Sequence, residues 1–142
     1  MGNCIFCEIL ANRQPVSLVY QDEFCTAFMD IQPINPGHLL VVPNRHAVNL
    51  AELDPETGAR LFQVAQRLAQ AVRQSGVNCE GVNFFLADGE AAGQDVFHVH
   101  LHVIPRYRGD GFGLRLPAKY YLRPGREKLD EVAGMIRNTL KP

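Results

Sequence analysis

The sequence predicts an α+β domain with a meander-like antiparallel sheet of about five strands, one long helix and a C-terminal helix. Three observations predict this class. Short apolar segments of strand length alternate with turn residues. One long segment repeats apolar residues at helical spacing, and a weaker such segment ends the chain. The strand-like segments mostly follow one another directly, which favours antiparallel hairpins over a parallel sheet.

The first part of the chain predicts a short helix and three strands. Residues 4–10 form the predicted helix, with its apolar side chains turned inward. Two strands, 18–20 and 24–29, are separated by a polar turn. A third apolar run, 38–42, has strand length and ends at Pro43.

The long helix is the clearest prediction. Asp54 is a candidate N-cap, and Pro55 suits the first helical position. Gly76 is a plausible stop. The spacing i, i+3, i+4, i+7 and i+11 creates one apolar face, made of Leu61, Val64, Ala65, Leu68 and Val72.

The remaining chain predicts two more strands and a final helix. The strands are 81–87 and 97–104, and Pro105 ends the second of them. A glycine-rich loop, 109–113, follows. The C-terminal helix is predicted from the spacing of Leu129, Val132, Ile136 and Leu140.

Length and composition indicate one domain spanning residues 1–142. With 142 residues, 46% of them hydrophobic, the chain is long enough to bury a core. A formal net charge of -1 argues against a broad surface for nucleic acid or anionic membrane. The sequence has neither a membrane-spanning stretch nor a signal-peptide pattern. We therefore expect a cytoplasmic protein whose 4 cysteines are reduced.

Three histidines alternate with apolar residues in the strand over 97–104. Because side chains alternate between the faces of a strand, His98, His100 and His102 share one face. Imidazoles this close resist simultaneous protonation, which lowers their pKa values. Neutral imidazole is a nucleophile, an acid–base catalyst or a metal ligand. The alternation therefore points to a chemical site rather than to a solvated sheet face.

The run from His98 to Ile104 resembles the motif His-φ-His-φ-His-φ-φ, in which φ is apolar, of the histidine triad (HIT) nucleotide-binding family. Flanking segments match the family's order: Phe28-Met29-Asp30-Ile31, Pro36-Gly37-His38, Val41-Val42-Pro43, Asn83 and Gly93-Gln94. The resemblance covers about residues 4–113 and is weaker over 114–142. It implies a single HIT-like domain that forms homodimers.

The resemblance also implies an activity and roles for residues. The protein would bind a purine nucleotide and release a nucleoside monophosphate, AMP, from a phosphoramidate or a dinucleoside polyphosphate. His100 would attack the α-phosphorus and form a nucleotidyl-histidine intermediate. Asp30 would bind the ribose. The phosphate would be surrounded by His38, His102, Asn83 and Gln94, and the base would lie against Phe6, Ile9, Phe28 and Ile31.

Asp95 departs from the family pattern, which often has Ser or Thr there. A hydroxyl donates hydrogen bonds to phosphate or to the leaving group, whereas an ionised carboxylate only accepts them and repels phosphate. Three interpretations of Asp95 remain open: it is protonated, it orients a histidine, or it turns away from the substrate.

A Cys-x-x-Cys pair, Cys4 and Cys7, suggests a zinc site. Zinc commonly takes four Cys or His ligands, so histidines would supply the other two. Some bacterial-type HIT proteins resemble this sequence in that pair, and their zinc is completed by histidines at the positions of His46 and His98. The resemblance thus implies a closed, structural zinc site. A redox-active or merely buried cysteine pair is the alternative.

Two other functions remain open. One is a metal-dependent hydrolase in which His98, His100 and His102 hold a catalytic ion, although histidines along one straight strand do not easily converge on a tetrahedral ion. The other is a nucleotide-binding sensor or scaffold with little turnover. The identity of the leaving group is not predicted by the sequence.

Overall fold

The computed structural model describes residues 4–140, and the ends 1–3 and 141–142 of the predicted domain lie outside the described residues. The chain divides into two compact units, one ending at Gly111 and the other beginning at Phe112. The elements in order are α1 (Ile5–Leu10), β1 (Leu18–Gln21), β2 (Cys25–Met29), β3 (Leu39–Pro43), α2 (Pro55–Gln74), β4 (Gly81–Phe85), the 3₁₀ helix η1 (Glu90–Ala92), β5 (Leu101–Arg106), the 3₁₀ helix η2 (Ala118–Tyr121) and α3 (Arg126–Arg137).

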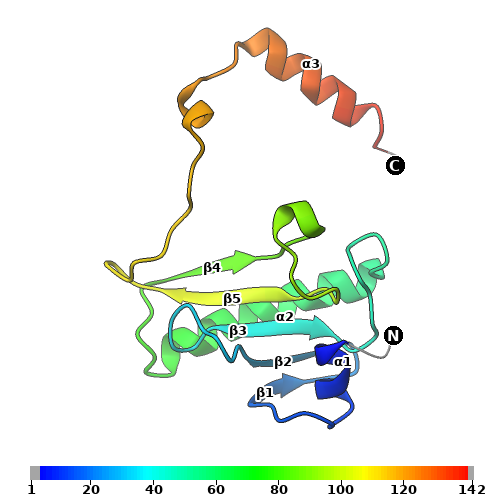
Figure 1. Cartoon of the computed structure of the whole chain (residues 1–142), viewed down its shortest axis with the longest axis vertical. Helices are drawn as coiled ribbons and strands as arrows, with labels where there is room; N and C mark the ends of the chain where they lie inside the picture. Colours follow the sequence, from blue (N-terminus) through cyan, green and yellow to red (C-terminus); the bar gives the residue numbers. More distant parts are fainter. Residues whose placement is uncertain (1–3, 141–142) are drawn as a thin grey trace. The chain divides into compact units, whose positions relative to one another are not determined.

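The α+β prediction is confirmed, with one refinement of the strand order. The five strands are all antiparallel to their neighbours and lie in the order β1-β2-β3-β5-β4 (Figure 1). The first three form a meander, but β5 rather than β4 pairs with β3. The reason is that α2 crosses the sheet and carries the chain to the far edge, from which the β4–β5 hairpin returns.

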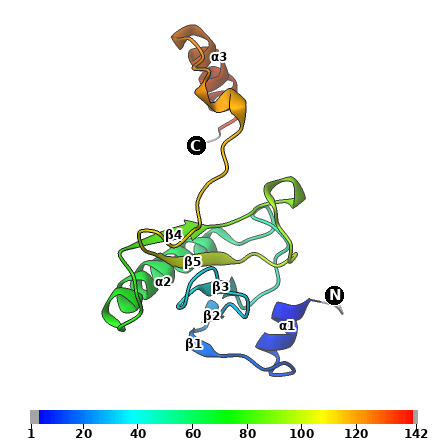
Figure 2. The same ribbon diagram turned by 60° about the vertical axis from the view of Figure 1, so that its left-hand side comes forward.

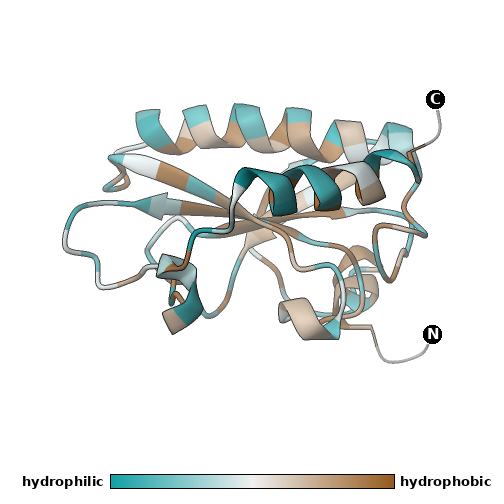
Figure 3. Ribbon diagram, turned by 90° about the horizontal axis from the view of Figure 1, so that it is seen from above, coloured by the Kyte–Doolittle hydropathy of each residue, from teal (hydrophilic) through white to brown (hydrophobic). Residues whose placement is uncertain are grey.

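The sheet separates two apolar clusters. On one face, the buried side of α2, which includes Leu61, packs against β2, β3 and β5. On the other face Phe6 of α1 packs against Phe28, Leu40 and Val42. The two helices lie on opposite sides of the sheet in Figure 2. In Figure 3 the strands are mostly hydrophobic, while hydrophilic residues mark the outer side of α2.

The predicted limits of α2 are confirmed. The Asp54 side chain accepts a hydrogen bond from the Thr57 N–H at 3.2 Å, as an N-cap does. After the C-cap Ser75, Gly76 takes a φ of 90°, a left-handed conformation that favours glycine.

The last strand of the sheet differs from the prediction at both ends. β5 begins at Leu101 rather than at residue 97, because the chain before it bonds to a loop instead, through Val99 N–H and the Ala47 carbonyl at 2.8 Å. It also continues through Pro105. β3 pairs with β5 only as far as Val103, so the N–H that Pro105 lacks is not needed by the ladder.

The alternation of side chains before and along β5 is confirmed all the same. Val99, Leu101 and Val103 belong to the cluster beneath α2. The His100 ring lies on the α1 side, 5.2 Å from the Phe6 ring. The histidines are thereby placed on the face that α1 partly covers.

The second unit contains η2 and the predicted C-terminal helix. That helix is confirmed as α3, but it ends at Arg137, so Leu140 lies beyond it. Its apolar residues Leu129, Val132 and Ile136 are exposed. Across residues 4–140, none of the helices combines the length and the apolar character that crossing a bilayer requires.

Asp22 joins the β1–β2 turn to α2, and we expect it to contribute to stability above pH 4. Burial opposes its ionisation, but hydrogen bonds from Cys25 N–H, Tyr20, Phe24 N–H and Arg60 lower its pKa from 3.8 to about 2. The folded state therefore favours the carboxylate, and this stabilisation disappears as pH falls from about 4 towards 2.

The Asp22→Asn variant should accordingly lose about 1 kcal/mol of unfolding free energy at pH 7, after allowance for solvent screening. Urea unfolding at pH 7 and at pH 3 measures the difference, which should shrink at the lower pH. Glu23→Gln, at an exposed neighbour, is the control. An equal loss at both pH values would contradict the assignment.

Candidate active site and metal-binding cluster

A cavity of about 360 Å³ lies on the α1 side of the sheet. It contains most of the predicted substrate-site residues, namely Phe6, Ile9, Phe28, Asp30, Ile31, Asp95, His100 and His102. Ile31 is almost fully exposed at 99%. The sequence did not single out the other lining residues, which are Ile5, Gln14, Pro15, Val16, Met29, Gln32, Leu40 and Val96. Most of these are apolar or lie in the loop between α1 and β1, where no motif marks them.

A hydrogen bond of the His100 ring determines which of its two nitrogens carries the proton and which carries the lone pair. Nδ1 lies 2.8 Å from the His98 carbonyl oxygen, which only accepts, so Nδ1 carries the proton. In neutral His100 the lone pair is then on Nε2. Phe6 packs edge-on against the ring and restricts its orientation. A neutral imidazole held in this tautomer presents a nucleophilic nitrogen.

His38 and His102 form a hydrogen-bonded relay beside His100. The backbone N–H of Ile34 donates to His38 Nδ1 at 3.0 Å, so His38 carries its proton on Nε2. That nitrogen lies 2.9 Å from His102 Nδ1 and 3.5 Å from Asp30 Oδ2. If it donates to His102 Nδ1, neutral His102 keeps its own proton on Nε2. The relay leaves His102 with an N–H available to a ligand.

The environment keeps both relay histidines neutral at pH 7. Burial, helped by the neighbouring His100 and His38, lowers the pKa of His102 to about 4. Burial also lowers the pKa of His38, and the nearby Asp30 only partly opposes this effect. Neither imidazole therefore adds a full positive charge to the site near neutral pH.

Three predicted site residues do not line the cavity. His38 is outside the lining and is hydrogen-bonded to His102, which belongs to it. Asn83 extends from β4 and accepts a hydrogen bond from Arg106. Gln94 is buried, and its amide bonds to the backbone of Gly89, Val48 and Val96. The polar groups of Asn83 and Gln94 therefore bind other parts of the protein.

The carboxylate of Asp95 lies at the cavity. Its Oδ1 is 3.6 Å from His100 Nε2, and the side chain is 84% exposed. Asp95 and Asp30 are the acidic residues among those lining the cavity.

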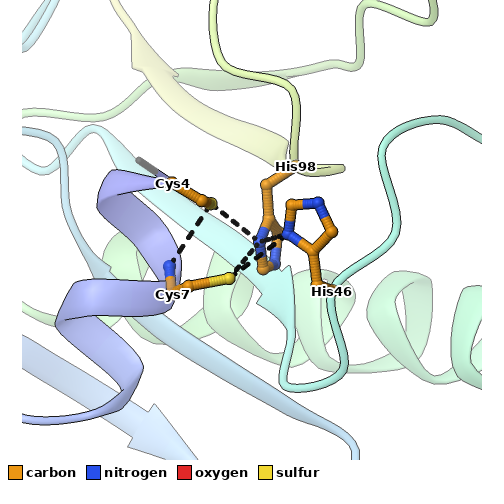
Figure 4. Close-up of side chains that lie close together, drawn as sticks. All are labelled: Cys4, Cys7, His46 and His98. Atoms are coloured by element: carbon orange, nitrogen blue, oxygen red, sulfur yellow. Dashed lines mark hydrogen bonds between the residues drawn. The ribbon is translucent and has the colours of Figure 1, made fainter. Parts of the chain in front are cut away.

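Four side chains from three separate segments converge beside the cavity (Figure 4). Cys4 and Cys7 come from the start of α1, His46 from the loop after β3, and His98 from the segment before β5. Their donor atoms all lie within 4.8 Å of one another. This is the set that the sequence resemblance implies.

The distances within this cluster fit a tetrahedral metal ion. The two Nδ1 atoms of His46 and His98 are 3.1 Å apart, Cys4 Sγ is 3.4 Å from His98 Nδ1, and Cys7 Sγ is 3.2 Å from His46 Nδ1. Tetrahedral bonds of about 2.0 Å to nitrogen and about 2.3 Å to sulfur place ligand atoms roughly 3.3–3.8 Å apart. The arrangement is therefore close to what a four-coordinate ion requires.

The protonation of the cluster is also compatible with a metal. His98 Nε2 donates to the Pro43 carbonyl at 2.9 Å, so its Nδ1 lone pair faces the cysteines. Burial, with contributions from Cys4 and Glu8, raises the pKa of Cys7 to about 11. A cation must displace that proton before the sulfur binds as thiolate.

A catalytic ion among the three histidines is disfavoured by the same hydrogen bonds. His98 Nδ1 is directed to the cysteines, whereas His100 Nε2 lies near Asp95. A second grouping, Asp30, His38 and His102, also has closely spaced donors. However, the Ile34 N–H occupies His38 Nδ1 and leaves a proton on Nε2, where a metal would have to bind. His38 Nε2 is instead close to His102 Nδ1 and to Asp30 Oδ2.

The chain belongs to the HIT family, because the HIT domain model matches residues 11–109. An uncharacterized HIT-like protein of Borreliella burgdorferi is 38% identical over 137 residues, 96% of this chain and 97% of its own length. A Zn-bound histidine triad family protein from Mycobacterium smegmatis has a crystal structure with 38% identity and a TM-score of 0.75, covering 97% of this chain and 98% of that one. An adenylylsulfatase, HINT3, of Arabidopsis thaliana is 31% identical over 135 residues, 95% of this chain and 66% of its own length.

Proposed function

We propose that this protein is a nucleotide hydrolase or transferase that releases AMP through a covalent intermediate on His100. The observation that carries the proposal is the hydrogen bond from His100 Nδ1 to the His98 carbonyl, which leaves the Nε2 lone pair near Asp95 of the cavity. Membership of the HIT family and similarity to a plant adenylylsulfatase support chemistry on an adenylyl group.

The reaction would proceed in two displacements at phosphorus. In the first, His100 Nε2 forms a bond to the α-phosphorus, and the bond to the leaving group breaks with its electron pair. The leaving group takes a proton from solvent water, while the neutral His102 Nε2–H donates a hydrogen bond to a phosphoryl oxygen. In the second, water attacks the phosphorus and loses a proton to solvent, and the N–P bond breaks with its electron pair returning to His100. The products are AMP and the protonated leaving group.

The nucleoside is expected to bind along the α1 side of the cavity. Phe6, Ile9 and Phe28 offer an apolar wall of the kind that accepts a purine face, and Ile31 lies at its exposed end. Asp30 accepts one backbone hydrogen bond from Gln32, which leaves lone pairs for the ribose hydroxyls. The cavity therefore combines one apolar and one accepting region.

A structural zinc ion would occupy the cluster of Cys4, Cys7, His46 and His98. The donor set and spacing suit tetrahedral zinc, and the Zn-bound relative supports this choice. With four protein ligands the ion would have no open position for water, so its role would be to anchor α1 rather than to react. We also propose that the protein is cytoplasmic and that it forms a homodimer. Analytical ultracentrifugation would measure the mass of the particle in solution.

A panel of substrates tests the proposed activity. Purified protein should release AMP from at least one of an adenylated amine, a dinucleoside polyphosphate or adenylyl sulfate, as followed by chromatography. Absence of AMP release from every compound, in a protein that binds AMP, would favour the sensor or scaffold alternative.

The pH dependence of turnover should reflect the neutral relay. Because burial lowers the pKa of His102 to about 4, protonation of His102 should not reduce kcat until pH falls below about 5. An unperturbed histidine would give this loss near pH 6.5. Replacing Asp30, which opposes the lowering, with Asn should shift the acid limb to lower pH. An upward shift in Asp30→Asn would contradict the relay.

A further inference from the structure

Asp95 places a carboxylate in the cavity beside the proposed nucleophile. Its carboxylate lies 3.6 Å from the nitrogen to which the phosphorus would bond, and His102, the proposed hydrogen-bond donor to the phosphate, lines the same cavity. The side chain is 84% exposed, so it lies at the solvent side of the cavity. In the proposed reaction the carboxylate would lie close to the phosphate bonded to His100 and to the group attached to that phosphate.

The backbone on either side holds Asp95 in this place. Gln94 is buried and makes three hydrogen bonds: it accepts from Gly89 N–H at 2.8 Å, and donates to the carbonyls of Val48 at 2.6 Å and Val96 at 3.1 Å. The carbonyl of Val96 directly follows Asp95 along the chain. The loop is thus pinned immediately before and after the acidic residue.

No cationic side chain offsets this charge among the described residues that line the cavity. Asp30 and Asp95 contribute carboxylates, and no Lys or Arg is present in the lining. A leaving group made of further phosphates or of sulfate adds negative charge next to Asp95. An amine leaving group adds none, and one that bears a second, protonated amine adds a positive charge. Coulomb repulsion and attraction at such distances separate these classes.

We propose that Asp95 determines leaving-group selectivity, so that the site prefers nucleoside phosphoramidates of amines carrying an additional positive charge and discriminates against polyphosphate and sulfate leaving groups. The inference rests on the proposed function and specifies its substrate class. In the cleavage step the P–N bond breaks, its electron pair stays on the amine nitrogen, and solvent water supplies the proton that the amine takes up. The second ammonium group of the amine interacts with Asp95 and does not react.

Two adenosine 5′-phosphoramidates of matched size test the proposal. One carries an N-(3-aminopropyl) group, which ends in an ammonium, and the other an N-butyl group, which ends in a methyl; diadenosine triphosphate is the third substrate. For the wild type, kcat/KM should be about three- to tenfold higher for the aminopropyl compound. Asp95→Asn should remove this preference and raise kcat/KM for diadenosine triphosphate several-fold. Added salt should reduce the wild-type preference.

Glu90→Gln is the matched control, since it removes an exposed negative charge from the same loop outside the cavity and should keep the wild-type preference. If Asp95→Asn retains the wild-type ratio of the two phosphoramidates, the selectivity role of Asp95 is refuted while the proposed function stands. Failure of the wild type to release AMP from any of the three compounds would instead overturn both.

Discussion

The His100→Ala variant is expected to bind AMP normally but to release AMP from substrate on the order of 10³–10⁶-fold more slowly than the wild type. The reason is that His100 supplies the only electron pair that the proposed first displacement uses. The apolar wall and Asp30, to which the proposal assigns the nucleoside, are other residues. Binding and turnover should therefore separate in this variant.

The covalent intermediate provides a second measurement of the same prediction. Rapid quenching of the wild type during turnover, followed by intact-protein and peptide mass spectrometry, should show one adenylyl group on the peptide that contains His100. His102→Asn is the informative comparison, because it keeps the nucleophile and removes the imidazole N–H that is proposed to bind the phosphoryl oxygen. It should be slow and still form the adduct. Equal, slow turnover by wild type and His100→Ala would refute the enzyme proposal in favour of a nucleotide-binding scaffold.

Loss of the proposed zinc ion is expected to have the second largest effect. Three segments meet at Cys4, Cys7, His46 and His98, and α1 contributes Phe6 and Ile9 to the cavity. Without the ion, two cysteines and two imidazoles remain close together with no cation to bind their lone pairs. Cys7→Ala should therefore contain no zinc, unfold several kcal/mol more easily and bind AMP at least about tenfold more weakly.

Elemental analysis, thermal unfolding and AMP titration measure these three effects. Cys79→Ser is the matched control, since Cys79 lies outside the cluster and donates a hydrogen bond to the Gly81 carbonyl. It should retain about one zinc per chain and its affinity for AMP. Wild-type protein without stoichiometric zinc, and with unchanged melting in chelator, would contradict the metal site.

Much of the fold is predictable because local signals agree with the packing. The helix over 55–74 has an N-cap, a proline and an apolar face, and each of these is used as predicted. The order of the last two strands is not predictable in this way, because it depends on how α2 crosses the sheet. The continuation of β5 through Pro105 depends on where its neighbour β3 ends, which no pattern within 97–106 records.

The sequence predicts which residues form the site better than it predicts what each of them does there. The alternation of three histidines predicts a common face, but each of them has a different hydrogen-bond partner. His98 bonds to the distant Pro43 carbonyl, His100 to the His98 carbonyl and His102 to the side chain of His38. Gln94 illustrates the limit. Nothing in its neighbourhood in the sequence distinguishes an amide that would meet phosphate from one that holds a loop, because the difference lies in the carbonyl of Val48, far away along the chain.

His98 connects the two centres through a single residue. Its imidazole belongs to the cysteine cluster, while its carbonyl oxygen accepts a hydrogen bond from the Nδ1–H of His100. A designer who transplanted the three imidazoles onto another sheet would therefore transfer the side chains without the tautomers that make them useful. To function in a new scaffold, the graft would need the peptide group at position 98 held at the same angle, together with whatever anchors it.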